Sequence, residues 1–318
     1  MQIRVSTGSA AVLGKKQIRL QEKPTTIYLL AHGECRGDCG FCPQARSFQG
    51  DKKWLSRVSW PLYELEELFP PGGLGKPLAE IKRICIQTIL EPDWSQKLIS
   101  AVRYLKSLPY LKDIPISASC RPVNIRQAES LLAAGIDRLG IPLDVATGEL
   151  FQRIKGGSFS AVYSTLVETA KAFPGRISTH LIIGLGESEE EAARLIQTLA
   201  QEGITTALFA LTPVLGTRLA KYSPPSRASY RRLQALRYLL AQGREVDLMF
   251  DSAGRITSFG YPKTELFELL SDGAAFQTSG CPGCNRPYYN ERPGEVPYNY
   301  PRPLSAGEIS QALAELGK

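Results

Sequence analysis

TIYLLAHGECRGDCGFCPQ, residues 26–44, is the stretch that decides the fold of this chain. Its apolar first part, Thr26–Ala31, predicts a buried β-strand. A polar loop follows at once and carries Cys35, Cys39 and Cys42 in the spacing C-x3-C-x2-C, with Phe41 before the third cysteine. A strand that delivers chemically active side chains into a loop is typical of a βα unit, in which function gathers after the strand.

Strand-like and helix-like segments alternate along the rest of the chain. Further strands are expected at Ile81–Gln87, Ile114–Ser119, Arg138–Ile141, Ile177–Ile183, Thr206–Leu211 and Val246–Phe250, and an eighth near Ala274–Thr278. Helical periodicity is found at Ser95–Leu105, Arg126–Ala134, Glu189–Gln201 and Ser226–Ala241. This alternation predicts an α/β fold with parallel strands and right-handed crossovers. Seven or eight units favour a (βα)8 TIM-type barrel, although a doubly wound sheet has the same local signals.

Composition changes divide the chain into three parts. We expect an N-terminal extension over residues 1–25, the barrel over 26–280, and an irregular cysteine-containing C-terminal cap and helix over 281–318. The cap is rich in Pro, Tyr and Asn. Its helix is predicted to begin at Ser305, because Ser305 and Glu308 have the spacing of a capping box.

The overall composition excludes several classes of protein. Of the 318 residues, 43% are hydrophobic and 22% charged, which excludes disorder or coiled coil for the whole chain. Neither a secretory signal nor a membrane-spanning run is visible, so we expect a cytoplasmic protein without membrane association. The net charge of +7 favours acidic partners. The longest basic runs, 15–16 and 231–232, are interpreted as solvated surface, so nucleic acid is not an expected partner.

The cysteines carry the strongest functional signal. The chain has seven, an odd number, and only two histidines. Without a secretion signal this count favours metal or redox use over disulfides. Three thiolates on one short loop can hold three corners of a 4Fe–4S cubane and leave one iron open. The alternatives are half of a zinc site, a ferredoxin-type cluster, or structural cysteines with this spacing by chance.

The triplet with its aromatic residue resembles the radical S-adenosylmethionine (SAM) superfamily. The resemblance implies that Cys35, Cys39 and Cys42 hold the cluster, whose open iron is chelated by the methionine end of SAM. It implies cleavage of SAM to a 5′-deoxyadenosyl radical that abstracts an unactivated hydrogen. Phe41 matches the position whose backbone contacts the adenine.

Within this superfamily the chain is similar to the biotin synthase branch. Cys42-Pro43-Gln44 matches that branch, and Cys85 and Cys120 match positions of its auxiliary cluster. The resemblance further implies that Asp144 contacts the ribose of SAM. The segment LIIGLGE, residues 181–187, resembles the fifth-strand motif that lies against the adenine; its candidate contacts are Ile182, Gly184 and Glu187.

Two departures break the auxiliary site of biotin synthase. Ser178 stands where the fifth-strand cysteine is expected, and Phe250 or Asp251 stands in place of an arginine on the seventh strand. The C-terminal pair Cys281 and Cys284 offers a substitute. Together with Cys85 and Cys120 it would complete four thiolates for a second, auxiliary 4Fe–4S cluster closing the top of the barrel. The alternatives are a structural zinc site, or core thiols at Cys85 and Cys120.

The tail GCPGCNRPYYNERP, residues 280–293, is similar to biotin-synthase-like subunits of two-component lipoyl synthases. This resemblance implies a sulfurtransferase that inserts sulfur into the octanoyl chain of an octanoylated lipoyl carrier protein or peptide, with the auxiliary cluster as sulfur source. It also implies a second radical SAM subunit and a flavodoxin or ferredoxin as electron donor. The alternatives are biotin synthesis, another small-molecule radical SAM reaction, and a non-catalytic iron–sulfur or zinc protein.

A few polar and aromatic residues remain open at this stage. His180 on the fifth strand could contact substrate or SAM, or be a buried structural histidine. Arg121 and Arg255 could meet a carboxylate or amide inside the barrel, or lie exposed at its rim. Tyr288 and Tyr289 could line an acyl channel or pack within the cap.

Overall fold

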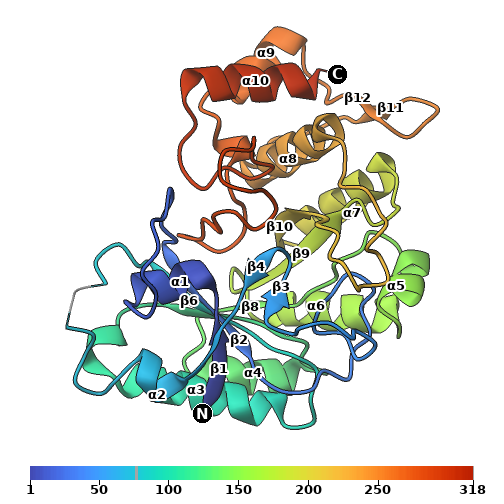
Figure 1. Cartoon of the computed structure of the whole chain (residues 1–318). Helices are drawn as coiled ribbons and strands as arrows, with labels where there is room; N and C mark the ends of the chain where they lie inside the picture. Colours follow the sequence, from blue (N-terminus) through green and yellow to red (C-terminus); the bar gives the residue numbers. More distant parts are fainter. Residues whose placement is uncertain (76–77, 318) are drawn as a thin grey trace.

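An eight-stranded sheet forms the centre of the computed structural model, which describes residues 1–75 and 78–317 (Figure 1). In spatial order its strands are β10 (Thr205–Ala210), β9 (Ile177–Ile183), β8 (Arg138–Gly140), β7 (Ile116–Ser119), β6 (Arg83–Gln87), β2 (Thr26–Ala31), β1 (Gln2–Val5) and β5 (Leu62–Glu64). The strands from β10 to β2 are parallel, whereas β1 pairs antiparallel with both β2 and β5.

The winding of the parallel strands distinguishes between the two predicted topologies. The parallel strands occur along the chain in the order β2, β6, β7, β8, β9 and β10, and each lies beside the next parallel strand. A doubly wound sheet reverses its strand order at a switch point, and this sheet does not. The α/β class and the barrel-type winding are thus confirmed, and over the described residues the sheet ends at β10 on one side and β5 on the other.

Ten α-helices are formed by the described residues. They are α1 (Thr7–Val12), α2 (Leu65–Leu68), α3 (Trp94–Ser107), α4 (Ile125–Ala133), α5 (Gly148–Ile154), α6 (Phe159–Ala172), α7 (Glu189–Gln201), α8 (Arg227–Ala241), α9 (Lys263–Leu269) and α10 (Ala306–Leu316). All four predicted helices are present, as α3, α4, α7 and α8. The predicted capping box of α10 is also present, with Ser305 and Glu308 exchanging hydrogen bonds.

Two of the expected barrel strands lie elsewhere. The seventh is reduced to β11 (Met249–Phe250), which pairs only with β12 (Ile256–Ser258). Asp251 closes this hairpin by accepting hydrogen bonds from the backbone N–H groups of Ala253 and Arg255. The segment expected as an eighth strand contains a 3₁₀ turn, Ala274–Phe276.

Short elements outside the predicted units complete the structure. Within the expected N-terminal extension, Gln2–Val5 joins the sheet as β1. A second hairpin, β3 (Trp54–Leu55) with β4 (Val58–Ser59), follows the cysteine loop, and a 3₁₀ turn at Pro109–Leu111 follows α3.

Alternation along the strands separates two faces of the sheet. On β9, Ile177, Leu181 and Ile183 belong to the main hydrophobic core, whereas Ser178 and His180 line a cavity on the other face. This is the two-residue period of a strand. One face therefore stabilises the fold, and the opposite face is available for chemistry.

The C-terminal helices stand above the sheet in Figure 1, and buried ion pairs join α8 to α10 and to α7. Arg231 on α8 is fully buried and binds Glu315 of α10 (Nε–Oε2 3.0 Å), and its neighbour Arg232 binds Glu189 of α7 (Nε–Oε1 2.6 Å). The interpretation of 231–232 as solvated surface was therefore wrong. A basic dipeptide can be buried when each guanidinium meets its own carboxylate.

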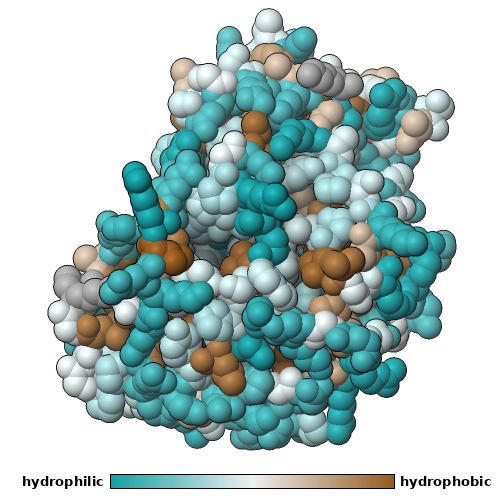
Figure 2. Space-filling view, in the orientation of Figure 1, coloured by the Kyte–Doolittle hydropathy of each residue, from teal (hydrophilic) through white to brown (hydrophobic). Residues whose placement is uncertain are grey.

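The face of the molecule seen in Figure 2 is mainly hydrophilic, with apolar patches across its middle, between the sheet and the C-terminal helices. No helix among residues 1–75 and 78–317 combines the length and the apolar character needed to cross a bilayer.

Candidate active site

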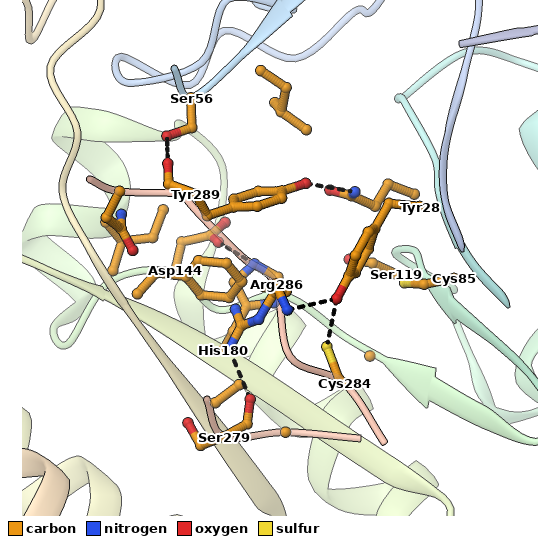
Figure 3. Close-up of a pocket in the computed structure, with 18 of the residues that line it drawn as sticks. Tyr28, Ser56, Cys85, Ser119, Asp144, His180, Ser279, Cys284, Arg286 and Tyr289 are labelled. Carbon is orange, nitrogen blue, oxygen red and sulfur yellow. Dashed lines mark hydrogen bonds and ion pairs between the residues drawn. The ribbon is translucent and has the colours of Figure 1, made fainter. Parts of the chain in front are cut away.

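A cavity on the inner face of the sheet contains most of the predicted site residues (Figure 3). Its wall combines strand residues, the cysteine loop and the C-terminal segment. The residues discussed below that line it are Tyr28, Phe41, Cys42, Leu55, Cys85, Gln87, Ser117, Ser119, Asp144, Ser178, His180, Ile182, Phe209, Ser279, Cys281, Cys284, Arg286 and Tyr289.

The cysteine triplet lies where the sequence predicts it, in the loop after the carboxyl end of β2. All three thiols are free and partly accessible. Backbone N–H groups point at two of the sulfurs: Leu90 donates to Cys35 Sγ and Gln44 donates to Cys42 Sγ, each over 3.4 Å. Hydrogen bonds to sulfur are typical of iron–sulfur sites.

The electrostatic surroundings of the three thiols favour the binding of a metal cluster. Burial raises the pKa of Cys39 to about 11, and nearby Lys155 opposes the rise while Asp144 and Cys35 add to it. Burial also raises the pKa of Cys42, with Cys39 and Cys35 contributing in the same direction. The three thiols thus lie close enough to repel one another as thiolates. A cluster would relieve that repulsion, because the metal neutralises its ligands.

Asp144 forms a buried charge network beside the triplet. Its carboxylate accepts hydrogen bonds from Lys155 Nζ and, over 2.7 Å, from His180 Nε2. Burial alone would raise the pKa of Asp144, but Lys155 and His180 hold it well below the usual range. His180 also lies edge-on to Phe209, with ring centroids 5.3 Å apart. Asp144 and His180 both line the cavity, whereas the side chain of Lys155 is 1% exposed. Lys155 escaped sequence reasoning, since it follows α5 with no motif of its own.

The residues of the fifth-strand motif have two roles: one lines the cavity, and the others shape the turn after β9. Ile182 lines the cavity, but Gly184 and Glu187 do not. The Glu187 carboxylate instead accepts hydrogen bonds from the backbone N–H groups of Gly184 (2.6 Å) and Leu185 (2.9 Å). Gly184 has φ +102°, and a Cβ there would lie 2.9 Å from Pro225. These two residues therefore shape the turn after β9 and do not face the cavity.

Three further thiols gather at the other end of the same cavity. Cys85 on β6 lies close to Cys281 and Cys284, and each of these two contributes to raising the pKa of Cys85, after burial, to about 12. The hydroxyl of Tyr28 lies 3.4 Å from Cys284 Sγ (Figure 3). In the sheet register Tyr28 stands opposite Cys85.

The C-terminal cysteine loop docks against the amino ends of the strands. Thr25, just before β2, donates to the carbonyl of Gly283 over 2.6 Å, and Arg83, the first residue of β6, donates to the carbonyl of Pro282 over 3.1 Å. Gly283 has φ +79°, and a Cβ there would lie 2.7 Å from Lys82 Cβ. The expected position at the top of the barrel is therefore wrong: the pair lies at the strand ends opposite the triplet.

Cys120 does not join this group. It is 2% exposed, packs in the main hydrophobic core and does not line the cavity. Burial alone raises its pKa to about 12, with no contribution from another thiol. Alternation explains this placement, since Ser117 and Ser119 on β7 face the cavity and the next residue therefore faces away. The predicted four-thiolate set is corrected to three thiols.

Aromatic side chains and one cation occupy the space between the two thiol groups. The Tyr289 ring lies 6.1 Å from Tyr28 and 6.2 Å from Phe209, and its hydroxyl accepts a hydrogen bond from Gln87. The Arg286 guanidinium lies 3.7 Å above the Phe209 ring and donates to the carbonyl of Ser279. Among the described residues the partner of this guanidinium is that carbonyl and not a carboxylate, and its Nε has no hydrogen-bond partner. No sequence pattern pointed to Arg286, because its position depends on the path of the C-terminal segment.

Comparison with known proteins identifies the family. A model of the "Radical SAM superfamily" matches residues 31–199. The chain belongs to the radical SAM superfamily.

Similar sequences include the biotin synthase of Synechococcus sp. (strain JA-3-3Ab), 26% identical over 230 residues, which are 70% of this chain and 70% of that protein. That of Desulforudis audaxviator is 29% identical over 228 residues, 68% of this chain and 66% of that protein. Among solved structures, the FeFe-hydrogenase maturase HydG from Carboxydothermus hydrogenoformans aligns with a TM-score of 0.53 and 16% identity, covering 92% of this chain and 66% of that one. This last likeness shows the fold alone.

Membership in the radical SAM superfamily implies a 4Fe–4S cluster and SAM, and the triplet fits this group. Its three thiols are mutually close, and backbone amides point at two of the sulfurs. No set of three or more His, Cys, Asp and Glu side chains in residues 1–75 and 78–317 is arranged to hold a single metal ion. With Cys120 in the core, the tetrathiolate that a zinc site would use is also absent from this part of the chain.

The remaining residues singled out from the sequence have separate positions. Ser178 lines the cavity and donates to the carbonyl of Leu139. Arg121 lies over the Phe151 ring, 5.9 Å away. Arg255 is exposed and pairs with Asp251 (2.7 Å) in the β11–β12 hairpin, so it does not meet a ligand inside the barrel. Phe250 is in the same hairpin.

The two neighbouring tyrosines of the cap have different environments. Tyr289 lines the cavity, whereas Tyr288, with φ +59°, does not.

Proposed function

We propose that this chain is a radical SAM sulfurtransferase of the lipoyl synthase type, which inserts sulfur into the octanoyl chain of an octanoylated lipoyl carrier protein. The observation that carries this proposal is that one cavity reaches both the triplet, through Cys42 alone, and a separate group of three thiols. Cys42 of the triplet lines one end, and Cys85, Cys281 and Cys284 line the other. Sulfur insertion at an unactivated carbon needs a radical source and a sulfur source on either side of one substrate.

The first end of the cavity would hold the radical source. When bound, the cluster on Cys35, Cys39 and Cys42 and SAM together supply a 5′-deoxyadenosyl radical that abstracts hydrogen from an unactivated carbon. Asp144, kept ionised by Lys155 and His180, can accept hydrogen bonds from the ribose hydroxyls. Glu187 and Gly184 keep the neighbouring turn in shape.

The second end would hold the sulfur source. Cys85, Cys281 and Cys284 would hold an auxiliary 4Fe–4S cluster. Its chemistry would be to provide sulfide for the carbon–sulfur bond and to take up, at a ferric iron, the one electron released when the substrate radical bonds to sulfide. The hydroxyl of Tyr28, 3.4 Å from Cys284, can donate to the cluster-bound sulfur. The docking of the Cys281–Cys284 loop on Thr25 and Arg83 would keep this end closed to solvent.

The space between the two ends suits an acyl chain. Tyr28, Phe209 and Tyr289 supply ring faces, and Leu55 adds an aliphatic wall. Burial of each methylene of an alkyl chain contributes about 0.8 kcal/mol. The unpaired Arg286 guanidinium would bind the carbonyl oxygen that ends the chain.

The partners follow from the charge and the chemistry. The net charge of +7 suits an acidic lipoyl carrier domain and an acidic electron donor, flavodoxin or ferredoxin. A lipoyl group carries two sulfur atoms, so a second radical SAM lipoyl synthase subunit would share the reaction.

A direct assay tests this proposal. The iron-loaded chain is incubated under anaerobic conditions with SAM, a reductant and an octanoylated carrier peptide, and in parallel with desthiobiotin. We expect 5′-deoxyadenosine and a mass gain of one sulfur atom on the octanoyl peptide only, and neither product with Cys42→Ala. Sulfur on desthiobiotin but not on the peptide would overturn the assignment.

A biotin-synthase-type reaction on a small free acid is the second candidate. The similar biotin synthases favour it, and so does Arg286, whose unpaired guanidinium could bind a free carboxylate as well as a carbonyl. The same assay distinguishes the two, because only one of the substrates ends in a carboxylate.

A further inference from the structure

The second thiol group lacks a fourth sulfur. Of the seven cysteines, three are in the triplet and Cys120 is in the hydrophobic core, so only Cys85, Cys281 and Cys284 remain. A 4Fe–4S cluster has four irons, each of which takes one external ligand. The structure therefore raises the question of which group meets the fourth iron.

Ser117 stands beside these thiols in the sheet. It lies on β7 directly opposite Cys85 on β6, and Cys85 in turn lies opposite Tyr28 on β2. Ser117 lines the cavity from this row, near both Cys85 and Cys281. Three neighbouring strands and the C-terminal loop thus point polar side chains at one place.

The hydroxyl of Ser117 has no nitrogen or oxygen partner in the part of the chain that the structure describes. The residue is 3% exposed, its Oγ forms no well-aligned hydrogen bond with a described residue, and the polar atoms it faces are the sulfurs of Cys85 and Cys281. Sulfur is a weak hydrogen-bond partner, so the burial of this hydroxyl is poorly compensated. Such a group in a cavity is expected where a ligand completes its interactions.

The other polar groups at this end are less suited to bind iron. The hydroxyl of Tyr28 accepts the backbone N–H of Arg286 over 2.8 Å and contacts Cys284. The Nε of Arg286 has no partner among the described residues, but a guanidinium carries only donors and cannot ligate a metal. Ser117 is therefore the group best placed to supply a ligand.

We propose that Ser117 Oγ is the fourth protein ligand of the auxiliary cluster, together with Cys85, Cys281 and Cys284. This inference rests on the auxiliary cluster of the proposed function and assigns its ligands. Ser117 would bind iron as the alkoxide, and its proton would leave to solvent. Oxygen is a harder ligand than thiolate and suits a cluster iron less well. The Ser117 corner is thus the one most readily released, which suits a cluster that gives up sulfide.

The test isolates the second site. Cys35, Cys39 and Cys42 are replaced together by alanine, and the reconstituted full chain is analysed for iron, for its Mössbauer spectrum and for the rate at which a chelator removes iron. The parent is expected to hold about four irons. Ser117→Ala is compared with Ser119→Ala, a serine on the same strand and the same face of the sheet.

If Ser117 is a ligand, Ser117→Ala changes the Mössbauer parameters of one iron and speeds iron loss by about tenfold or more. Ser119→Ala leaves both unchanged. Ser117→Cys restores slow iron loss with a spectrum typical of four thiolates, which shows that the site is still folded. Cys120→Ala retains the iron, whereas Cys85→Ala loses it.

Each failure has its own signature. If Ser117→Ala and Ser119→Ala behave alike, or if Cys120→Ala loses iron as Cys85→Ala does, the ligand assignment is wrong while the auxiliary cluster stands. If the parent binds zinc or no iron at all, the proposal of an auxiliary cluster is wrong, and the proposed function then has no sulfur source.

Discussion

The two thiol groups of the cavity differ in how the chain builds them. Cys35, Cys39 and Cys42 lie on one loop, so their proximity follows from spacing alone. Cys85, Cys281 and Cys284 come from the second parallel strand and the C-terminal segment, about two hundred residues apart in the sequence. The first group is a local motif, whereas the second exists only when the C-terminal segment docks. The first group can therefore be predicted from the sequence, whereas the second depends on the whole fold.

The sharpest way to separate the two groups is to remove one at a time. Cys42→Ala should reduce 5′-deoxyadenosine formation by about 10³-fold or more, as the loss of an essential catalytic group does. Cys281→Ala should leave that rate within about twofold but abolish sulfur transfer. Both products are measured by liquid chromatography and mass spectrometry. Equal loss of 5′-deoxyadenosine in both variants would contradict the assignment of SAM cleavage to the first thiol group and of sulfur donation to the second.

The charge network at the first group predicts a large effect on stability. Asp144→Asn leaves the buried Lys155 without its counter-charge and should lower the free energy of unfolding of the apoprotein by about 3–5 kcal/mol. Lys155→Met added to Asp144→Asn should restore most of this loss, because the unpaired cation is then gone. Urea denaturation measures the unchanged protein and both variants. A double variant no more stable than Asp144→Asn alone would show that the ion pair is not the cause.

Docking of the second group depends on backbone conformation. Gly283→Ala places a Cβ against Lys82 at a positive φ and should destabilise the protein by about 2–3 kcal/mol. Gly294→Ala is the matched control, since Gly294 also has a positive φ (+92°) but a Cβ there would meet no atom within 4 Å. Chelator removal of iron from the second site should accelerate in Gly283→Ala only. Equally faster iron loss in both variants would show that docking of the Cys281–Cys284 loop against Lys82 does not hold the second site together.

A smaller effect is expected from pH. Burial raises the pKa of Cys39 to about 11 and of Cys85 to about 12, so the folded apoprotein retains these protons above pH 9 while the unfolded chain releases them. Stability is therefore fully present below pH 8 and should fall by about 1–2 kcal/mol per thiol between pH 8 and 10.5.

Single variants assign this pH effect to each thiol group. Cys39→Ala and Cys85→Ala should each flatten the pH dependence of urea denaturation in part. If neither changes the slope, the thiols are not buried as their surroundings indicate.

The parts of the site that were predictable share a simple property. The triplet, Phe41 and Asp144 lie in loops that follow strands, and Ile182 lies near the carboxyl end of one. Parallel strands bring these ends together. Gly184 and Glu187 belong to the same motif, but they support a turn. The error at Cys120 was avoidable, because alternation along Ile116–Ser119 already assigns position 120 to the core face.

By itself, the sequence determined six of the parallel strands, four of their helices and the cysteine triplet, because these depend on spacing over a few residues. The order in which the parallel strands pair was decided by the tertiary structure. Only the tertiary structure decided which thiols face the cavity beside Cys85, that Lys155 and His180 hold Asp144 ionised, and that Arg286 enters the space between the two thiol groups. Those arrangements join segments far apart in the chain. They depend on how the C-terminal segment packs across the sheet, and no local pattern encodes that path.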